Sequence, residues 1–353
     1  MPLISGPSIG LDIGTSAVRA AQVTRTKAGP ALTGFGQVAL PQGVVVDGEI
    51  RDPGPVSEAI SQLWKRAKFR SKRATIGVAN QRVVVRQVDL PFLEEKEFRS
   101  SLRYQVADHI PMPPESAELD FQIIEDYVTD ESEHFMRVLL VAADTEMVQG
   151  FLSAVDAANI VPAGVDLTPF AVARAVSAAA RGETGVAGAE AVVDVGAGVT
   201  NIIVHHNGEA RFVRILLVGG DDPTAALAEE LDLEYEEAEA VKLDMSSLGA
   251  TPEAQRIVGE RVESLVEEIR GSLDYYASQD DSEPVTSLML TGGGSLTPGL
   301  IPALQRKVGL QVVPGRPLSD LDTSRSGLTD EQIAQIEPVA SAAVGLAIGT
   351  AVR

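Results

Sequence analysis

Two aspartates, each followed by glycines and hydroxyl-bearing side chains, are the residues of this sequence best suited to chemistry. One lies in Asp12–Ser16 (DIGTS) and the other in Asp194–Thr200 (DVGAGVT), each directly after a short apolar run. Glycines let backbone N–H groups approach a ligand with no Cβ in the way. A carboxylate beside such amides suits a phosphate bridged by Mg²⁺, because carboxylates bind this hard cation directly or through its water. Either aspartate could instead be an ordinary turn residue at the end of a strand.

The surroundings of the two aspartates are repeated. They are 194 − 12 = 182 residues apart, about half of the 353-residue chain. Each glycine segment lies between two strand-like runs, and a turn and a third run follow, at 31–38 and at 209–216. Two copies of such a unit predict two similar halves that face one cleft. A third glycine turn, within Leu288–Thr297 (LMLTGGGSLT), also follows an apolar run.

The three turns resemble the phosphate-1, phosphate-2 and adenosine motifs of the superfamily that contains actin, the sugar kinases and the Hsp70 ATPases. The resemblance spans nearly the whole chain and implies an α/β, bilobal actin-like ATPase fold of duplicated ribonuclease H-like halves. Within that superfamily, Val88–Tyr104, 106–113 and 119–122 resemble the characteristic insert of the PilM family of type IV pilus assembly. The form Gly-Ala-Gly-Val-Thr-Asn of the second turn fits PilM and its relative, the division protein FtsA.

The resemblance assigns roles to the two aspartates and implies ATP and Mg²⁺ as cofactors. Asp12 would hold Mg²⁺, through water. Asp194 would position the metal or an attacking water, and it is the one catalytic candidate. Phosphoryl transfer depends mostly on positioning and charge neutralisation, so these parts suffice to bind ATP, and we expect a slow ATPase at most. Hydrolysis also needs a residue that orients water; Asp166 and Thr168 both remain candidates.

A further set of residues would contact ATP. The stretch Ala238–Lys242 resembles a helix of the superfamily that contacts ribose and adenine. Its spacing puts Glu239 and Lys242 on one helix face. The complete set that the resemblance implies is Gly14, Thr15, Ser16, Gly196, Gly198, Thr200, Asn201, Glu239, Lys242, Gly292, Gly293, Gly294 and Ser295.

Composition excludes several classes of function. The net charge of −21 disfavours non-specific nucleic-acid binding and direct docking on anionic lipid. The absence of cysteine excludes disulfides, thiolate catalysis and cysteine-based zinc sites. The N-terminal residues lack the features of a signal peptide, and no run of about 20 apolar residues occurs. We therefore expect a cytoplasmic protein that meets a membrane only through partners, and the resemblance implies that this is the inner face of the inner membrane.

The elements that position these residues suggest a division into subdomains. Residues 94–110 and 145–159 have helical periodicity, and 121–127 and 137–141 alternate like strands, which predicts an α+β subdomain. The resemblance implies that this subdomain is an insert of the type called 1C. The apolar stretch 338–352 predicts a buried closing helix, with a membrane anchor as the alternative. The expected division is 1–79 (1A), 80–160 (1C), 161–186 (return to 1A), 187–224 (2A), 225–283 (2B), 284–335 (2A) and 336–353 (C-terminal helix on 1A).

The resemblance to PilM implies an ATP-binding cytoplasmic component of the type IV pilus inner-membrane platform. In that family a groove beside the insert binds the N-terminal cytoplasmic segment of the membrane protein PilN, in a nucleotide-linked way. Candidate groove residues lie around Val85–Leu90 and in the helix Glu94–Ile110, where an exposed strand edge could accept an extended peptide. Further implied partners are pilus assembly ATPases, platform proteins and other copies of the chain.

Three other functions remain open. An FtsA-like, filament-forming division protein would need a membrane-binding tail. An enzyme of the sugar-kinase type would need a catalytic base and a small-molecule pocket between the lobes. An actin-like scaffold that no longer binds nucleotide would need neither, although the intact motifs argue against it.

Overall fold

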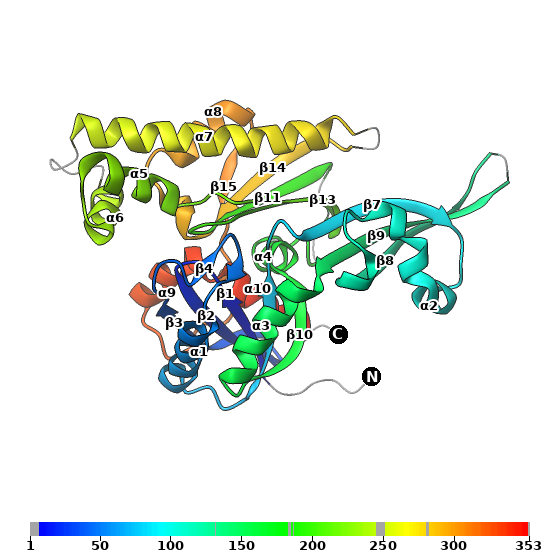
Figure 1. The fold of residues 1–353 in the computed structure, drawn as a ribbon, viewed down its shortest axis with the longest axis horizontal. Helices are drawn as coiled ribbons and strands as arrows, with labels where there is room; N and C mark the ends of the chain where they lie inside the picture. Colours follow the sequence, from blue (N-terminus) through cyan, green and yellow to red (C-terminus); the bar gives the residue numbers. More distant parts are fainter. Residues whose placement is uncertain are drawn as a thin grey trace.

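The structure, a computed structural model, consists of two α/β lobes with an insert that projects from one side (Figure 1). It describes residues 7–130, 132–182, 185, 187–244, 251–279 and 282–351. Residues 1–6, 186 and 352–353, which belong to the expected first, third and last segments, lie outside the described residues. The expected α/β class with two similar halves is confirmed by the two sheets described below.

The sheet of the first lobe has the strand order β10-β6-β1-β2-β3. Strands β1 and β2 form an antiparallel hairpin, β3 continues it, and β6 and β10 add in parallel. The bounds are β1 Ser8–Ile13, β2 Ala17–Thr26, β3 Gly29–Ala39, β6 Arg73–Val78 and β10 Val161–Leu167, with a small hairpin of β4 Val45–Val46 and β5 Glu49–Ile50.

The sheet of the second lobe repeats this order as β13-β12-β11-β14-β15. Here β11 and β12 form the antiparallel hairpin, β13 continues it, and β14 and β15 add in parallel. The two sheets therefore share one topology, as the sequence repeat predicts. The bounds are β11 Ala189–Val195, β12 Thr200–His206, β13 Glu209–Leu216, β14 Val285–Thr291 and β15 Val312–Pro314.

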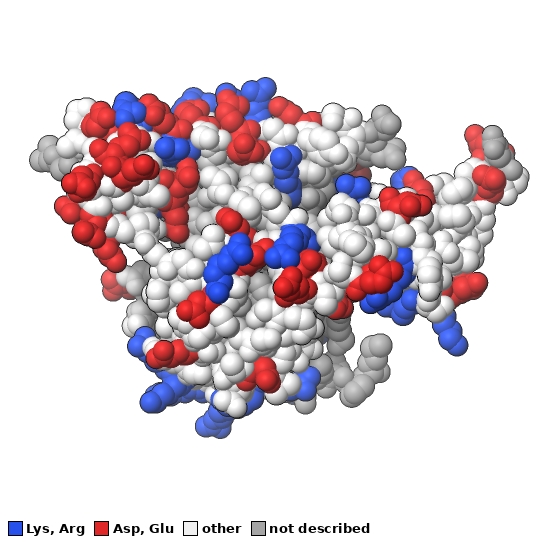
Figure 2. All heavy atoms as spheres, in the orientation of Figure 1, with Lys and Arg blue, Asp and Glu red and all other residues white. Residues whose placement is uncertain are grey.

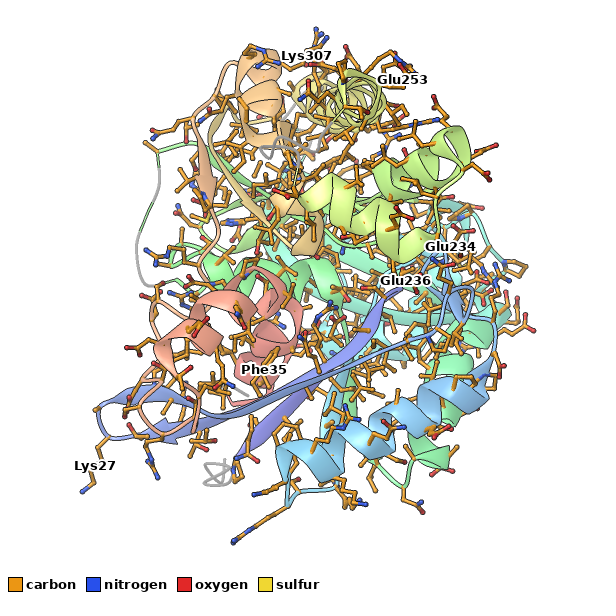
Figure 3. The ribbon with its side chains drawn as sticks, turned by 90° about the vertical axis from the view of Figure 1, so that its left-hand side faces the viewer. Lys27, Phe35, Glu234, Glu236, Glu253 and Lys307 are labelled. Atoms are coloured by element: carbon orange, nitrogen blue, oxygen red, sulfur yellow. The ribbon has the colours of Figure 1, made fainter. Side chains whose placement is uncertain are left out.

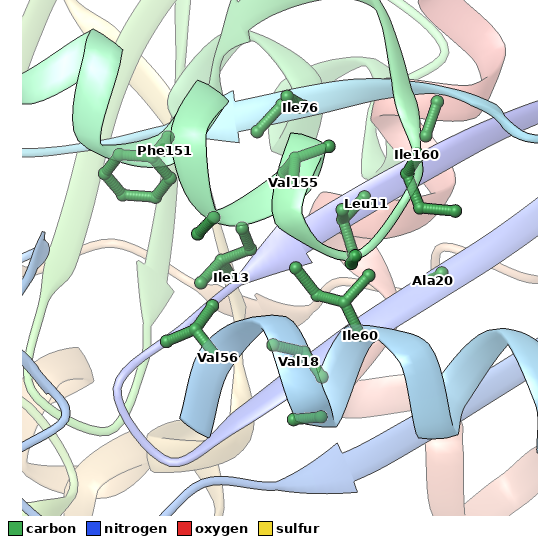
Figure 4. Close-up of a cluster of buried hydrophobic side chains, with 14 of the residues drawn as sticks. Leu11, Ile13, Val18, Ala20, Val56, Ile60, Ile76, Phe151, Val155 and Ile160 are labelled. Atoms are coloured by element: carbon green, nitrogen blue, oxygen red, sulfur yellow. The ribbon is translucent and has the colours of Figure 1, made fainter. Parts of the chain in front are cut away.

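Helices cover both sheets. Apolar faces of α1 and α3 fill the core of the first lobe, in which Phe151 and Val155 of α3 pack with Leu11 and Ile60 (Figure 4). Helices α5, α7 and α8 cover the second sheet. The bounds are α1 Pro53–Ala67, α3 Thr145–Ala157, α4 Thr168–Val176, α5 Asp221–Leu231, α6 Tyr235–Leu243, α7 Pro252–Ala277, α8 Leu300–Val308, α9 Asp330–Ile336 and α10 Ser341–Ala351.

The insert has its own small sheet, ordered β7-β9-β8, and its own core. Phe98 and Leu102 of helix α2 pack there against Met136 and Leu140 of β9. Helix α3 was expected within the insert (80–160), but its buried residues join the core of the first lobe. The bounds are β7 Val83–Pro91, α2 Glu95–Gln105, β8 Ala117–Val128 and β9 His134–Asp144.

Helix α10 packs between β1 and α4 with small residues at the contacts. A Cβ on Gly345 would lie 1.7 Å from the carbonyl oxygen of Ala171, and one on Gly10 would lie 2.1 Å from that of Ala343. Glycine therefore lets the helix approach both neighbours closely. None of the helices in the described residues is long and apolar enough to span a membrane.

Candidate functional site

A cavity of about 430 Å³ lies between the two lobes, where the three glycine turns converge. Twelve of the residues expected at the site line this cavity. They are Asp12, Gly14, Thr15, Ser16, Asp194, Gly196, Asn201, Glu239, Lys242, Gly292, Gly293 and Gly294. The site is thus built from the ends of β1, β11 and β14 and from helix α6.

The first two turns have the same local geometry. Gly14 N–H donates to the Ala17 carbonyl at 3.1 Å, and Gly196 N–H donates to the Val199 carbonyl at 2.9 Å. Each bond spans three residues and closes the hairpin directly after its aspartate. A Cβ on Gly196 would lie 2.7 Å from the Val199 oxygen, so this turn requires glycine.

The two turns approach each other across the cleft. A Cβ on Gly198 would lie 2.9 Å from Oγ1 and 3.2 Å from Cγ2 of Thr15. Gly198 therefore does not line the cavity; its missing side chain instead makes room for the first turn. This contact sets how closely the two phosphate-type turns can approach.

The third turn packs onto the second. Gly292 has a φ of 89°, and a Cβ there would lie 2.3 Å from the Val195 carbonyl oxygen and 2.6 Å from Oδ1 of Asp194. Its N–H donates to the Pro338 carbonyl at 2.9 Å. Nearby, Gly220 N–H donates to the Gly196 carbonyl at 2.9 Å. Glycines thus let three backbone segments meet around the Asp194 carboxylate.

The two aspartates have different cross-strand partners. Asp12 is paired in register with Arg19, whose Nη1 lies 3.9 Å from Asp12 Oδ2. Asp194 is paired with Asn201, whose Nδ2 donates to Asp194 Oδ2 at 3.1 Å. Oδ1 of Asn201 is buried and has no hydrogen-bond partner. A buried acceptor without a donor beside a carboxylate is an arrangement that a bound cation or its water would complete.

Burial perturbs both carboxyl groups. It raises the pKa of Asp12 above its ordinary value, and the positive charge of Arg19 opposes that rise. Burial raises the pKa of Asp194 to about 6; the hydrogen bond from Asn201 opposes the rise, and the charge of Asp12 adds to it. Two desolvated carboxylates that face one cleft repel each other, so a divalent cation between them would be favourable.

The ammonium group of Lys242 makes its polar contacts with other residues of the protein. Its Nζ is buried and donates to the Gly220 carbonyl at 2.7 Å and to Thr224 Oγ1 at 2.8 Å, and it pairs with Glu239 at 2.6 Å. Lys242 therefore holds α6 to the loop before α5, which leaves Glu239 as the partly exposed member of the pair. In Figure 3, Glu234 and Glu236 mark the start of this helix on the side of the upper lobe that faces the first lobe.

Two expected hydroxyl ligands point elsewhere. Thr200 Oγ1 is buried and donates to the Val218 carbonyl at 2.7 Å, and Ser295 Oγ donates to the Gly292 carbonyl at 2.6 Å. Neither residue lines the cavity. Of the two candidates for orienting water, Thr168 lines the cavity, whereas Asp166 lies outside it and is ion-paired with Arg174.

Sequence reasoning missed several residues of the cavity wall, among them Arg19, Asp221 and Tyr235. Burial, together with the nearby Asp221, raises the pKa of the Tyr235 phenol above its ordinary value, so Tyr235 remains a hydrogen-bond donor at neutral pH. The sequence did indicate a helix start at Gly219–Asp222, because two glycines there precede two acidic residues.

Comparison with known proteins identifies the family. Residues 10–351 match the family described as type IV pilus assembly protein PilM. The chain belongs to this PilM family. A solved PilM–PilN type IV pilus biogenesis complex contains a chain that is 27% identical, with full coverage of both chains and a TM-score of 0.84.

More distant relatives share the fold. Cell division protein FtsA of Streptococcus pneumoniae is 23% identical over 86% of this chain and 74% of its own length. The ethanolamine utilization protein EutJ from Carboxydothermus hydrogenoformans is 16% identical, covers 99% of this chain and 91% of its own, and has a TM-score of 0.57. MreB 5 of Spiroplasma citri is 12% identical, covers 88% and 91%, and has a TM-score of 0.51. This PilM-family chain therefore has an actin-like fold.

Proposed function

We propose that this protein is an ATP-binding, cytoplasmic component of the type IV pilus inner-membrane assembly platform, held at the membrane by partners. The observation that carries the nucleotide part is the pair of half-buried aspartates, Asp12 and Asp194, at equivalent positions of two glycine turns that face one cavity. Membership of the PilM family supports the pilus part.

The cavity wall fits Mg-ATP chemically. Asp12, Asp194 and the unpartnered Oδ1 of Asn201 offer hard oxygen ligands, directly or through water, and the glycine turns offer backbone amides. Among the described residues, no three His, Cys, Asp or Glu side chains gather so that they could hold a metal ion, so phosphate oxygens and water would have to complete the coordination of Mg²⁺. Bound Mg²⁺ would neutralise phosphate charge. A fold relative, MreB 5 of Spiroplasma citri, was solved bound to AMPPNP.

Hydrolysis of bound ATP needs residues beyond those that bind it. Asp194, with its raised pKa, is the residue that we assign to positioning metal or water, and Thr168 is placed to orient water from the N-terminus of α4. We assign no general base, and we expect hydrolysis to be slow at most.

Mg-ATP calorimetry on wild type, Asp12→Ala and Asp12→Asn tests the nucleotide site. Losing a carboxylate that acts on a phosphate-bound cation should weaken binding at least about tenfold in both variants, because a hydrogen bond to a charged group contributes about 1.5–3 kcal/mol. Circular dichroism should show an unchanged fold. Affinity equal to that of the wild type in both variants would contradict the assignment of Asp12.

We further propose that the N-terminal cytoplasmic segment of PilN binds in a groove of about 580 Å³ between the insert and the first lobe, which residues of β12 and β13 of the second lobe also line. Edge strands β8 and β10 border this groove, and Val148, Leu152 and Phe170 supply apolar contacts. An extended peptide can add to such an edge while its side chains enter the pocket. The related chain with a TM-score of 0.84 comes from a PilM–PilN complex, which supports this partner.

This location differs from the one that we expected around Val85–Leu90 and the helix Glu94–Ile110. Helix α2 does not line this groove, because Phe98 and Leu102 turn inward to the core of the insert. Strand β7 lies at the opposite edge of the small sheet. We therefore assign the PilN segment to the β8 edge.

Two matched variants test the groove. Leu152→Glu places a charge among its apolar contacts, whereas Val128→Glu makes the same kind of change at the exposed far end of β8, where the side chain is 63% exposed. Titration of a synthetic PilN N-terminal peptide should show binding weakened by at least about tenfold for Leu152→Glu, from about 1.4 kcal/mol of lost burial and added desolvation. It should be unchanged for Val128→Glu. Equal loss in both variants would place the segment elsewhere.

The FtsA relatives support one alternative, a filament-forming division protein. That function predicts ATP-dependent filaments that pellet in high-speed sedimentation. Association with pilus assembly ATPases, with other platform proteins or with further copies of the chain is compatible with the pilus proposal. Sedimentation with and without Mg-ATP separates limited self-association from filament growth.

A further inference from the structure

A second, separate groove of about 1140 Å³ lies between the insert and the second lobe. Strand β7, an edge of the insert sheet, borders one side, and β13, an edge of the second sheet, borders the other. The two strands approach each other, and Gln87 Nε2 of β7 donates to the Ala210 carbonyl of β13 at 2.8 Å. Among the described residues, no backbone hydrogen bond joins β7 to β13. Two strand edges thus face one space without closing it.

The first part of the β7 edge, ahead of Arg86, lacks the usual protection against an added strand. Exposed edges are normally shielded by charged side chains, prolines or bulges, because unpaired N–H and C=O groups attract other strands. Here Val83, Val84 and Val85 form a half-buried apolar run along the groove, and its pairing with β9 is regular. At a rise of about 3.3 Å per residue, the stretch 83–87 can pair with roughly five residues of an extended chain.

Cations in this groove lack carboxylate partners. Arg86, Arg214 and Arg261 are exposed and line the groove, and no carboxylate of the described residues lies within ion-pair distance of them. By contrast, Arg211 in the same wall pairs with Glu209 at 3.2 Å. The carboxylates in the lining are Asp222 and Glu268.

This arrangement is unusual in a chain with a net charge of −21. Figure 2 shows Lys and Arg side chains beside acidic ones in the middle of the drawn face, whereas acidic side chains crowd the outer end of the upper lobe. Unpaired guanidinium groups in an acidic protein attract anionic partners, and guanidinium binds carboxylates with two parallel hydrogen bonds.

We propose that the β7–β13 groove binds an extended, acidic segment of a partner protein, which adds as a strand to β7 and places its carboxylates against Arg86, Arg214 and Arg261. The groove shares no lining residue with the one that we assign to PilN, so both can be occupied together. Because the occupant would contact two sheets, it would hold the insert against the second lobe.

A synthetic probe tests this surface without knowledge of the natural partner. A fluorescent, end-capped peptide of alternating Glu and Val is titrated into the full chain and followed by anisotropy. We expect saturable binding that weakens with added salt, because the ionic contacts are exposed. The same peptide with methylated backbone nitrogens should bind more weakly, since it cannot pair with a strand edge. A peptide of alternating Lys and Val should not bind.

Charge reversals locate the site. The double variant Arg86→Glu, Arg261→Glu should bind the acidic probe at least about tenfold more weakly, because two attractive ionic contacts are replaced by repulsive ones. Lys96→Glu is the matched control, because Lys96 is exposed on α2 and lines neither groove. It should bind the probe like the wild type, and thermal unfolding should show that all variants fold.

Three results would overturn the proposal. The first is the absence of saturable binding of the acidic probe in low salt. The second is equal binding of the acidic and basic probes, or equal loss in the Lys96→Glu control. The third is a probe-free dimer in sedimentation velocity that the double variant dissociates, which would assign the groove to a second copy of the chain.

Discussion

The two phosphate-type turns share one backbone geometry but differ in the residue that faces each aspartate. Both turns close with a hydrogen bond from the glycine two residues after the aspartate. In the first turn the cross-strand partner is the cation Arg19, whereas in the second it is the neutral amide Asn201. The first half therefore offsets part of the burial cost of its carboxylate, and the second half leaves Asp194 with a pKa of about 6.

Because of this difference, we expect Asp12 and Asp194 to have different roles at the site. The charge of a neighbouring arginine favours the ionised form of a carboxylate, which can then act as a fixed anchor for a hydrated cation. A carboxylate that titrates near neutral pH can exchange a proton for a cation or a water molecule as the ligand arrives. Duplication thus supplied two equivalent positions, and the residues opposite them distinguish an anchor, Asp12, from a responsive group, Asp194.

The largest effect should come from breaking the contact between the turns. Gly198→Val places a branched side chain where Cβ alone would lie 2.9 Å from Thr15 Oγ1, so the turns must separate. We expect calorimetry to show Mg-ATP binding weakened by about 100-fold or more, which corresponds to about 2.7 kcal/mol. Ser16→Gly, at the equivalent position of the first turn, should change affinity only a few-fold. Normal binding by Gly198→Val would show that the contact between the turns does not shape the site.

A smaller effect should be a difference between the two aspartates in how their substitution changes stability with pH. Because the folded pKa of Asp194 is raised to about 6, the folded protein binds the proton of this carboxyl group more tightly than the unfolded chain does. The protonated group therefore contributes stability that is fully present below the unfolded pKa and is lost as pH rises through about 6. Asp194→Asn should therefore stabilise the ligand-free protein by about 1–2 kcal/mol at pH 8 and less near pH 5.5.

Asp12→Asn is the matched control for this experiment, because it leaves Arg19 without its carboxylate. It should give a smaller gain at pH 8 than Asp194→Asn does. Urea denaturation at both pH values measures the difference. The comparison fails if Asp194→Asn gives no gain at pH 8, or if the two variants respond identically.

The smallest effect should come from giving the first turn the partner of the second. Arg19 lowers the pKa of Asp12 by its charge, so Arg19→Asn should let burial raise that pKa further. Mg-ATP affinity should then fall a few-fold, and the loss should be larger at pH 5.5 than at pH 8, because higher pH favours the ionised carboxylate. Calorimetry at the two pH values measures this change, and an equal loss at both would mean that Arg19 contacts the nucleotide itself.

Local pattern was enough to predict the turns but not the orientation of every side chain in them. The repeat of apolar run, aspartate and glycine determines where a strand ends, which is why Asp12, Asp194 and Gly292–Gly294 meet at one cavity. Thr200 fits the same pattern, yet its hydroxyl donates to the Val218 carbonyl, which lies 18 residues away. Such a partner depends on the path of the chain after β13, which spacing within the motif does not specify.

Prediction of the helix faces from the sequence was limited in the same way. The spacing of Glu239 and Lys242 correctly puts both on one side of α6, where they form an ion pair. That Lys242 is buried against the Gly220 carbonyl depends on how α6 docks on α5. Likewise, α3 has the periodicity of an amphipathic helix, but only the arrangement of the lobes determines that its apolar face fills the core of the first lobe.

We propose that this protein contacts PilN in a nucleotide-linked way. A coupled calorimetric titration tests this proposal most directly. A synthetic PilN N-terminal peptide is titrated into the protein with and without Mg-ATP, and Mg-ATP is titrated with and without the peptide. The account predicts that both ligands bind and that each changes the affinity of the other by the same factor. Peptide binding with no detectable Mg-ATP binding, or two affinities that are independent of each other, would contradict it.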